Sequence, residues 1–444
     1  MKFPDIQWTA MEAPGNGLQP AAACGIPRVA NAASPREDAI GLLRLAAEIE
    51  HALMVQYLYA AQSLRDSDAR TLSTVAVQEM GHLLTVQNLL LAIAGVNEHG
   101  YPAVIHFGRD TLRRASNLNP LPLTLESLSR TTLGNFVAIE SPGKFDNPAV
   151  AERVETLRLK AGRLGYTTRP VHNLYAAIHW LFLADDEVQP VLADIGTCTP
   201  GWHLAEEDFV DPATIDRFAA TQTEWHSIPG FIAMPVRNRA EALAAIDAIT
   251  LQGEGVTGSE DSHFARYIRL LDRLEAGAVR VRPLARTPHL PGTVIPEDPS
   301  ARPVTHPITV LWAELFNLQY ECLLVLIAWS YSKPQGSPTR AKAIDFAVDL
   351  MNQVIQPLAN DLSSRALDEQ GPQKAGPPYG LRDETMPSDA ASFAARFATL
   401  DRSERETLSR IKETLMQGDD PVARLRIDSI ENYCQQRQQL LQEN

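Results

Sequence analysis

The sequence predicts a mainly α-helical protein, a four-helix bundle with long irregular insertions and additional C-terminal helices. Apolar residues recur at every third or fourth position along two long segments, about residues 35–64 and 69–94, as they do on the buried face of a helix. A short polar turn joins these segments, so the two helices are expected to lie antiparallel. The sequence contains neither Gly-x-Gly-x-x-Gly after a predicted strand nor Gly-x-x-x-x-Gly-Lys, the two common nucleotide-binding motifs. Nucleotide-binding folds therefore have no support.

The composition is that of a globular protein, with 45% hydrophobic and 21% charged residues in a chain of 444. The net charge of −14 argues against a nucleic-acid backbone or an anionic membrane surface as a partner. The four cysteines show no Cys-x-x-Cys spacing, which suits a reducing compartment rather than a disulfide framework or a zinc knuckle. There is no signal-peptide pattern and no apolar run of the roughly 20 residues that a membrane span needs. We therefore expect a cytoplasmic protein that does not enter a membrane.

The chain divides into five parts by composition and periodicity. An irregular N-terminal arm rich in Pro, Gly and Ala covers residues 1–34, and the helical bundle with its loop insertions covers residues 35–275. A Pro- and Arg-rich connector, residues 276–305, leads to helices that pack on the bundle, residues 306–390. A charged helical tail, residues 391–444, completes the chain.

The first helix has a clear start and an unusual buried face. Ser34 is placed to cap the helix, Pro35 stands at its first position, and Glu37 completes a capping box. Glu50 interrupts the apolar stripe of this helix, which indicates a metal ligand or a buried carboxylate paired with a nearby base. Glu48 lies about 200° around the helix from Glu50 and is expected to be solvated.

The second helix carries Glu79 and His82 within its apolar stripe, three residues apart, so both side chains point into the core. Burying an ionised Glu without a partner is costly, and a metal ion removes that cost. Inward-facing Glu-x-x-His pairs supply ligands in di-iron helical bundles, although a Glu–His hydrogen bond in a core has the same spacing. Glu50 and Glu79 lie at similar distances from the turn and should face each other at one height.

The middle of the chain gives weaker signals. Residues 96–150 are rich in turn formers and predict no sustained helix, so Phe136–Pro142 is expected to be a short strand or a single turn. Glu140, within it, is expected at the surface. A helix over about 169–184 places Asn173 near its apolar face, with Tyr175 beside that face.

A second Glu and His pair follows a helix over about 239–252. The helix breaks at Gly253-Glu254-Gly255, because two glycines in three residues disfavour its continuation. After Gly258 a helix resumes with His263 on its inward stripe. Glu254 and His263 thus mirror Glu79 and His82 across a break, although a Glu between glycines is often only a turn residue.

Several separated segments resemble one family of enzymes. They occur in order between about residues 38 and 380, and they are Glu50-His51-Ala52-Leu53-Met54-Val55-Gln56-Tyr57-Leu58-Tyr59, Gln78-Glu79-Met80-Gly81-His82-Leu83, Phe136-Val137-Ala138-Ile139-Glu140, Gln252-Gly253-Glu254-Gly255, Asp261-Ser262-His263-Phe264, Asp349-Leu350-Met351 to Pro357-Leu358, and Ala375-Gly376-Pro377-Pro378. The chain resembles the ferritin-like domain of the iminophenyl-pyruvate dimer synthases, which couple amino-acid-derived imines in violacein, rebeccamycin and staurosporine-type pathways.

The resemblance implies a ferritin-like four-helix bundle that binds iron as one or two Fe2+ ions, with manganese as the alternative. It implies metal ligands at five positions: Glu50, Glu79, His82, Glu254 and His263. Where the family tends to carry a Glu just before Leu174-Tyr175, this chain has Asn173. A di-iron site normally uses four carboxylates and two histidines. Either Glu140 supplies the missing oxygen, or the site holds one metal, or it has lost redox activity.

Three functions are compatible with these buried polar residues. The first is an iron-dependent oxidoreductase of natural-product biosynthesis that acts on a small amino-acid-derived substrate with O2 or peroxide, as a homo-oligomer or beside a pathway enzyme. Tyr57, Tyr175 and Asn173 would line its pocket. The second is a non-catalytic metal-binding protein, and the third is a metal-free coupling or scaffold protein. The long irregular segments favour the enzyme, because a storage bundle needs no loops to shape a substrate site.

Overall fold

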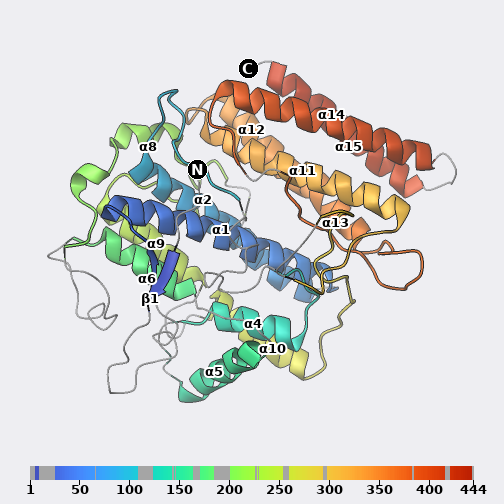
Figure 1. The fold of residues 1–444 in the computed structure, drawn as a ribbon, viewed down its shortest axis with the longest axis horizontal. Coiled ribbons are helices and arrows are strands. Elements are labelled where there is room, and N and C mark those ends of the chain that lie inside the picture. The colour runs from blue at the N-terminus through green and yellow to red at the C-terminus, as the bar shows by residue number, and fades with distance from the viewer. Residues whose placement is uncertain are drawn as a thin grey trace.

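The computed structural model confirms a mainly α-helical protein arranged in two layers of helices (Figure 1). The structure describes these residues: 6–9, 26–65, 67–108, 124–142, 145, 147–163, 171–184, 201–225, 228, 230–253, 260–293, 298–382, 385–415 and 421–442.

The first layer is built around the antiparallel pair α1 (Pro35–Gln62) and α2 (Ser67–Ala94). The Ser34 side chain caps α1 by accepting a hydrogen bond from the Glu37 backbone N–H, as the sequence predicts. The solvated position expected for Glu48 is wrong, because the segment after α2 covers that side of α1. Glu48 is buried, and its Oε1 accepts a hydrogen bond from His106 Nε2 at 2.6 Å.

Five more helices complete this layer. α6 (Val171–Phe182) packs on α1, and α9 (Arg239–Gly253) packs on both α6 and α2. α10 (His263–Glu275) contacts α2, α9 and α4 (Arg130–Ile139), while α5 (Pro148–Arg163) covers α4. Several of these helices meet at the middle of the α1–α2 pair, where Glu50, Glu79 and His82 interrupt the apolar faces of α1 and α2.

The segment around Phe136 differs from the prediction. It is the last turn of α4, not a strand or an isolated turn. The Ser129 side chain caps this helix by accepting from the Thr132 backbone N–H, a start signal that the turn-rich flanks obscure in the sequence. Glu140 is the C-cap residue and is only 3% exposed, so the expected surface position is also wrong.

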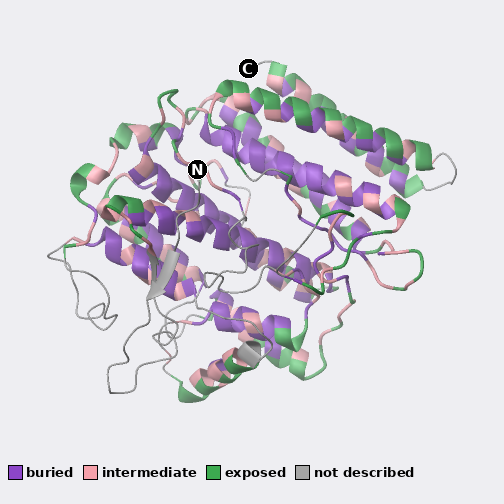
Figure 2. Ribbon diagram, in the orientation of Figure 1, coloured by how far each residue is buried: buried purple, intermediate pink, exposed green. Residues whose placement is uncertain are grey.

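The second layer is C-terminal. Its central helix, α11 (Pro307–Tyr331), packs against α12 (Pro338–Asp349) and α14 (Ala390–Leu415), and α15 (Pro421–Gln442) lies beside α14 (Figure 1). A π-helical turn, η3 (Leu350–Ile355), leads into α13 (Gln356–Leu362). α11 is buried over almost its whole length, whereas α14 and α15 expose one face (Figure 2).

Within the described part of the chain, α11 alone has the length and hydropathy of a membrane span, which the sequence analysis did not anticipate. Of the residues in its most apolar stretch, 89% are buried inside the protein. The apolar surface of α11 therefore serves as the inner face of the second layer.

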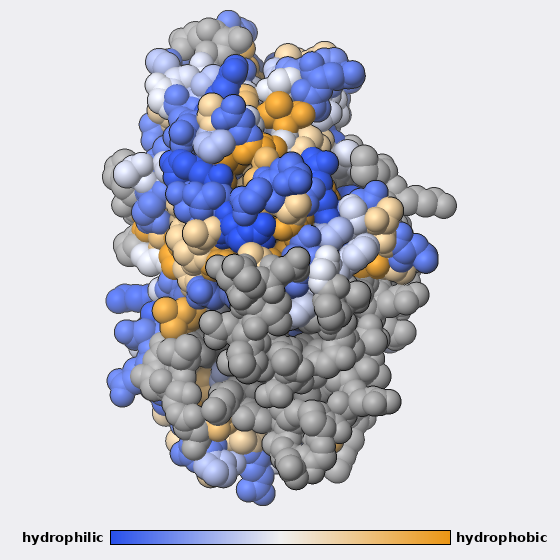
Figure 3. All heavy atoms as spheres, turned by 90° about the vertical axis from the view of Figure 1, so that its left-hand side faces the viewer, coloured by the Kyte–Doolittle hydropathy of each residue, from blue (hydrophilic) through white to orange (hydrophobic). Residues whose placement is uncertain are grey.

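The remaining elements are short. β1 (Ile6–Thr9) and β2 (Ile26–Val29) pair antiparallel, so the arm that we expected to be irregular contains a small two-stranded sheet. A 3-10 turn, η2 (Glu206–Asp208), and α8 (Pro212–Phe218) follow the bundle helix α6. From the side at the left of Figure 1, the described surface is largely hydrophilic with small hydrophobic patches between (Figure 3).

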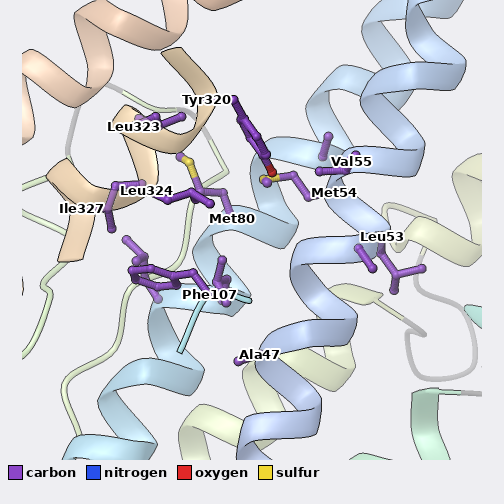
Figure 4. Packing of buried hydrophobic residues seen from close by; sticks show 14 of the residues in the cluster. Ala47, Leu53, Met54, Val55, Met80, Phe107, Tyr320, Leu323, Leu324 and Ile327 are labelled. Carbon is purple, nitrogen blue, oxygen red and sulfur yellow. The ribbon is translucent and has the colours of Figure 1, made fainter. Parts of the chain in front are cut away.

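The two layers share one hydrophobic core. Side chains of α11, among them Tyr320, Leu323 and Leu324, face Met80 of α2 across this core, with Phe107 beside them (Figure 4). A buried histidine of α1 adds polar contacts between the layers: His51 Nδ1 donates to the Phe107 carbonyl, and the Tyr320 hydroxyl donates to His51 Nε2. The helix that carries Glu50 is thereby held against the second layer.

Candidate metal centre

Five of the predicted ligands meet in the middle of the first layer. They come from four helices: Glu50 from α1, Glu79 and His82 from α2, Glu140 from the end of α4, and His263 from the start of α10. None is more than 3% exposed. The helical stripes of α1, α2 and α10 explain why four of them point inward. Glu140 reaches the same place because α4 ends there.

These residues form two overlapping groups. In the first group, Glu50, Glu79 and His82, the His82 Nδ1 atom lies 2.8 Å from Glu79 Oε2 and 3.4 Å from Glu50 Oε2. In the second group, Glu79, Glu140 and His263, the His263 Nδ1 atom lies 3.0 Å from Glu79 Oε1 and 3.7 Å from Glu140 Oε1. Glu79 belongs to both groups and presents a different oxygen to each. Within each group one ligand atom per residue lies within 4.8 Å of the others, so each group could hold a metal ion.

The hydrogen bonding of the centre is incomplete in a way that fits a metal. Glu79 Oε1 and His263 Nδ1 are fully buried, and among the described residues neither has a hydrogen-bond partner of good geometry. Buried polar atoms are nearly always satisfied, so such a pair marks a place for a missing ligand. Three carboxylates and two imidazoles are the donor types that iron and manganese accept. The described residues therefore fit a bound metal.

A small cavity of about 10 Å³ adjoins these groups. Four ligands from the two groups, Glu50, Glu79, His82 and Glu140, line it together with residues of α6 and α9 such as Val171 and Thr250. It has room for about one water or ion and is too small for an organic substrate.

The charges of the centre interact strongly. Burial raises the pKa of Glu50 to about 7, and the charge of Glu79 adds to this effect. Burial alone would lower the pKa of His82, but hydrogen bonds and charge from Glu50 and Glu79 outweigh it and raise the pKa to about 10. Burial also acts to lower the pKa of His263, but the charges and hydrogen bonds of Glu79 and Glu140 outweigh it and raise the pKa to about 9. Without metal, the two imidazoles thus hold protons that a bound cation would have to displace.

Two tyrosines hold ligand carboxylates in place. The Tyr57 hydroxyl donates to Glu140 Oε1 at 2.5 Å, and the Tyr175 hydroxyl donates to Glu50 Oε1. Burial, followed by the charge of Glu140, raises the pKa of Tyr57 well above its ordinary value, so its hydroxyl keeps its proton. Tyr175 also lines the cavity. Two of the three residues that the sequence assigned to a pocket thus contact the ligands directly.

Two predicted site residues are not among these five ligands. Glu254 falls outside the described residues, so its position relative to His263 is untested. Asn173 is buried on α6, but it belongs to neither ligand group and does not line the cavity.

Two glutamines of the sequence motifs, for which the sequence predicted no role, bond the imidazoles of the centre. His82 Nε2 donates to Gln252 Oε1 at 2.9 Å, and His263 Nε2 donates to Gln78 Oε1 at 3.2 Å. Both glutamines stand next to a motif residue, Glu79 or Gly253, which was the available signal. Helical periodicity alone could not assign them, because their partners lie on other helices.

Comparison with known proteins agrees with this fold and these motifs. A family model described as ferritin-like matches residues 43–272. Dichlorochromopyrrolate synthase of Lentzea aerocolonigenes is 28% identical over 419 residues, which cover 83% of this chain and 38% of that protein. The 2-imino-3-(indol-3-yl)propanoate dimerase of Chromobacterium violaceum is 27% identical over 395 residues, which cover 80% of this chain and 35% of that protein.

The chain thus spans less than two fifths of the length of either relative. No solved structure matches it. The matched relatives fit the enzymes that the sequence motifs resemble, and the family model covers more than half of the chain, including the helices that carry all five buried ligands. The chain belongs to the ferritin-like family.

Proposed function

We propose that this chain is a metal-dependent oxidoreductase that acts on a small amino-acid-derived substrate, by oxidative or imine coupling in natural-product biosynthesis. The observation that carries the proposal is the pair of buried ligand groups sharing Glu79. A synthase and an imine dimerase among its relatives support the reaction class. Because the chain spans only part of those proteins, the substrate is proposed at the level of class alone.

Iron is the proposed metal, with manganese as the alternative. Glu50, Glu79 and His82 would hold one ion, and Glu79, Glu140 and His263 would hold a second. When bound, the metal would supply redox chemistry and an open coordination position for O2 or peroxide. In this proposal Glu140 provides the oxygen that Asn173 cannot.

The protein's own residues would keep the centre dry and rigid. Tyr57 and Tyr175 each bond one oxygen of a ligand carboxylate, and in Glu50 this leaves Oε2, the oxygen that faces His82, free for the metal. The cavity is too small for an amino-acid-derived imine, so the substrate would bind beside the ligands, along the α6 and α9 side lined by Val171 and Thr250. We place the protein in the cytoplasm, with a small-molecule substrate and a second copy or a pathway enzyme as partner.

A non-catalytic metal-binding protein is the second candidate. The observation that favours it is the ligand count, because the described centre has three carboxylates where a di-iron site normally has four.

Two measurements test the proposal. Protein produced in iron-rich medium should contain about one to two iron ions per chain, as a di-iron bundle would. The ferrous protein should then consume O2 faster when an aromatic amino-acid-derived imine is added. Iron without substrate-dependent O2 consumption would leave the binding protein as the function. An iron content below about a tenth of an ion per chain would refute both the oxidoreductase and the metal-binding protein.

A further inference from the structure

A matching pair of glutamines holds the two imidazoles of the centre. Gln252 of α9 accepts from His82 Nε2, and Gln78 of α2 accepts from His263 Nε2, at 2.9 and 3.2 Å. Each glutamine belongs to a different helix from its histidine. In both cases the Nδ1 atom is left to face the carboxylates, and the two rings stack with their centroids 5.5 Å apart.

Gly230 lies next to both glutamine side chains. Gln252 Nε2 donates to the Gly230 carbonyl at 3.1 Å, which turns the amide so that its oxygen faces His82. A Cβ added to Gly230 would stand 3.1 Å from Gln78 Nε2, so a side chain at this position would crowd the Gln78 amide. Gly230 also has a φ of +76°, a conformation that favours glycine.

The backbone after Gly230 is itself fixed against α2. A Cβ on Gly81 would lie 2.7 Å from the Ile232 backbone nitrogen, so only glycine allows the helix and this segment to approach so closely. One turn later, Thr85 Oγ1 donates to the Ile232 carbonyl at 3.0 Å. Gly81 directly precedes His82, so the contact lies at the ligand itself.

We propose that Gln252 and Gln78 are positioning residues that keep the proton of each imidazole on Nε2, and that the Gly230 carbonyl orients the Gln252 amide while the missing Cβ of Gly230 leaves room for the Gln78 amide. The Nδ1 lone pairs are thereby presented to the metal. A ligating histidine almost always donates its other N–H to an acceptor, commonly a carboxylate. Here an amide oxygen does so without adding negative charge to a centre that already buries three carboxylates. This inference rests on the proposed metal centre.

Two single substitutions test the positioning role. Gln252→Met and Gln78→Met keep the side-chain length and remove the acceptor. With Co2+ as the probe, followed by its visible absorption, each should weaken binding roughly 10- to 100-fold. Gln252→Met should act on the first group and Gln78→Met on the second. Gln252→Glu, which restores an acceptor, should recover the absorption spectrum. Unchanged affinity in both Met variants would overturn the proposal.

The matched control is Gln87→Met. Gln87 is the other buried glutamine of α2, and its side chain makes two hydrogen bonds to the backbone of His106, away from the ligands. Its substitution should leave Co2+ binding unchanged. A Gln87→Met loss as large as that of Gln252→Met would show a general packing effect and overturn the specific role.

A second readout needs no metal. In metal-free protein labelled with 15N-histidine, the Nε2–H groups of His82 and His263 should give slowly exchanging ring N–H resonances. Gln252→Met should remove the first and Gln78→Met the second. Persistence of both signals in the variants would overturn the positioning role. Signals that respond as expected, in a protein that binds no Co2+, would support the positioning role and refute the proposed metal centre.

Discussion

Two of the buried clusters of charged side chains in the described part of the chain differ in how their charge is balanced. In the second layer, both terminal nitrogens of Arg437 bond carboxylates: Nη1 and Nη2 donate to Glu404, and Nη2 also donates to Asp401. In the first layer, three carboxylates face two imidazoles, and Glu79 Oε1 and His263 Nδ1 lack a hydrogen bond within the described chain. The cluster of the second layer is balanced by a permanent cation, whereas that of the first layer is balanced by imidazole protons that a bound metal ion would displace.

The largest effect is expected from breaking the internally balanced cluster. Arg437→Met leaves Glu404 and Asp401 buried without a cation, and such a loss costs about 3–5 kcal/mol of the free energy of unfolding. Urea denaturation should measure it. The control is Arg410→Met, which removes a half-exposed partner of Glu314 and should cost less than about 1 kcal/mol. Equal costs for the two variants would contradict the comparison.

Glu79→Gln should have the largest effect on the other cluster. It changes the one carboxylate that both groups share, so metal content should fall at least about tenfold while the helical signal stays intact. Metal analysis after dialysis and circular dichroism are the measurements. Glu48→Gln is the matched control, since Glu48 is a buried carboxylate of α1 that bonds His106 outside the centre. If Glu79→Gln retained its metal, the proposed centre would be refuted.

The metal-free protein should lose stability as the pH rises. His82 and His263 have pKa values raised to about 10 and about 9, so the fold binds their protons more tightly than the unfolded chain does. This stabilisation is complete below pH about 6.5 and is lost as the pH rises through about 9 to 10. Glu50, with a pKa raised to about 7, shifts stability in the same direction between pH about 4.5 and 7.

Melting temperatures of metal-free protein between pH 6 and pH 10 should reveal this trend. Metal competes for the same atoms, so metal affinity should rise over that range and binding should release protons. A melting temperature of the metal-free protein that rises with pH would contradict the charge balance described for the centre.

The smallest effect is expected from Tyr175→Phe. It removes one hydrogen bond to Glu50 and should weaken metal binding at the first group by about tenfold. Tyr433→Phe is its control, because that hydroxyl bonds the Phe346 carbonyl in the second layer. Isothermal titration with Fe2+ would compare the two. Equal affinities would show that the tyrosine does not orient its carboxylate.

The ligands that could be predicted from the sequence are those on long helices. Glu50, Glu79, His82 and His263 interrupt apolar stripes, and a stripe of period 3.6 states which way a side chain points. Glu140 could not be placed in this way, because its helix is short and flanked by turn residues. Its position depends on where α4 ends and on packing against α10, which are tertiary facts.

The wrong exposure predicted for Glu48 and the absence of a predicted role for Gln252 have the same cause. A helix pattern distinguishes an inner from an outer face, but it does not reveal a later segment that covers the outer face, as the one containing His106 does. Nor does it reveal a hydrogen bond between residues 170 positions apart, as between His82 and Gln252. The family resemblance predicted the fold and the motifs, whereas the contacts of Glu48 with His106 and of His82 with Gln252 depend on the tertiary structure.

The shared position of Glu79 has a consequence for how the proposed centre would fill. Its Oε2 faces His82 and its Oε1 faces His263, so an ion bound on one side fixes the rotation of the carboxylate for the other side. The second ion then loses less conformational entropy on binding than the first. This orientation would therefore favour the second ion and partly offset the repulsion between the two like charges.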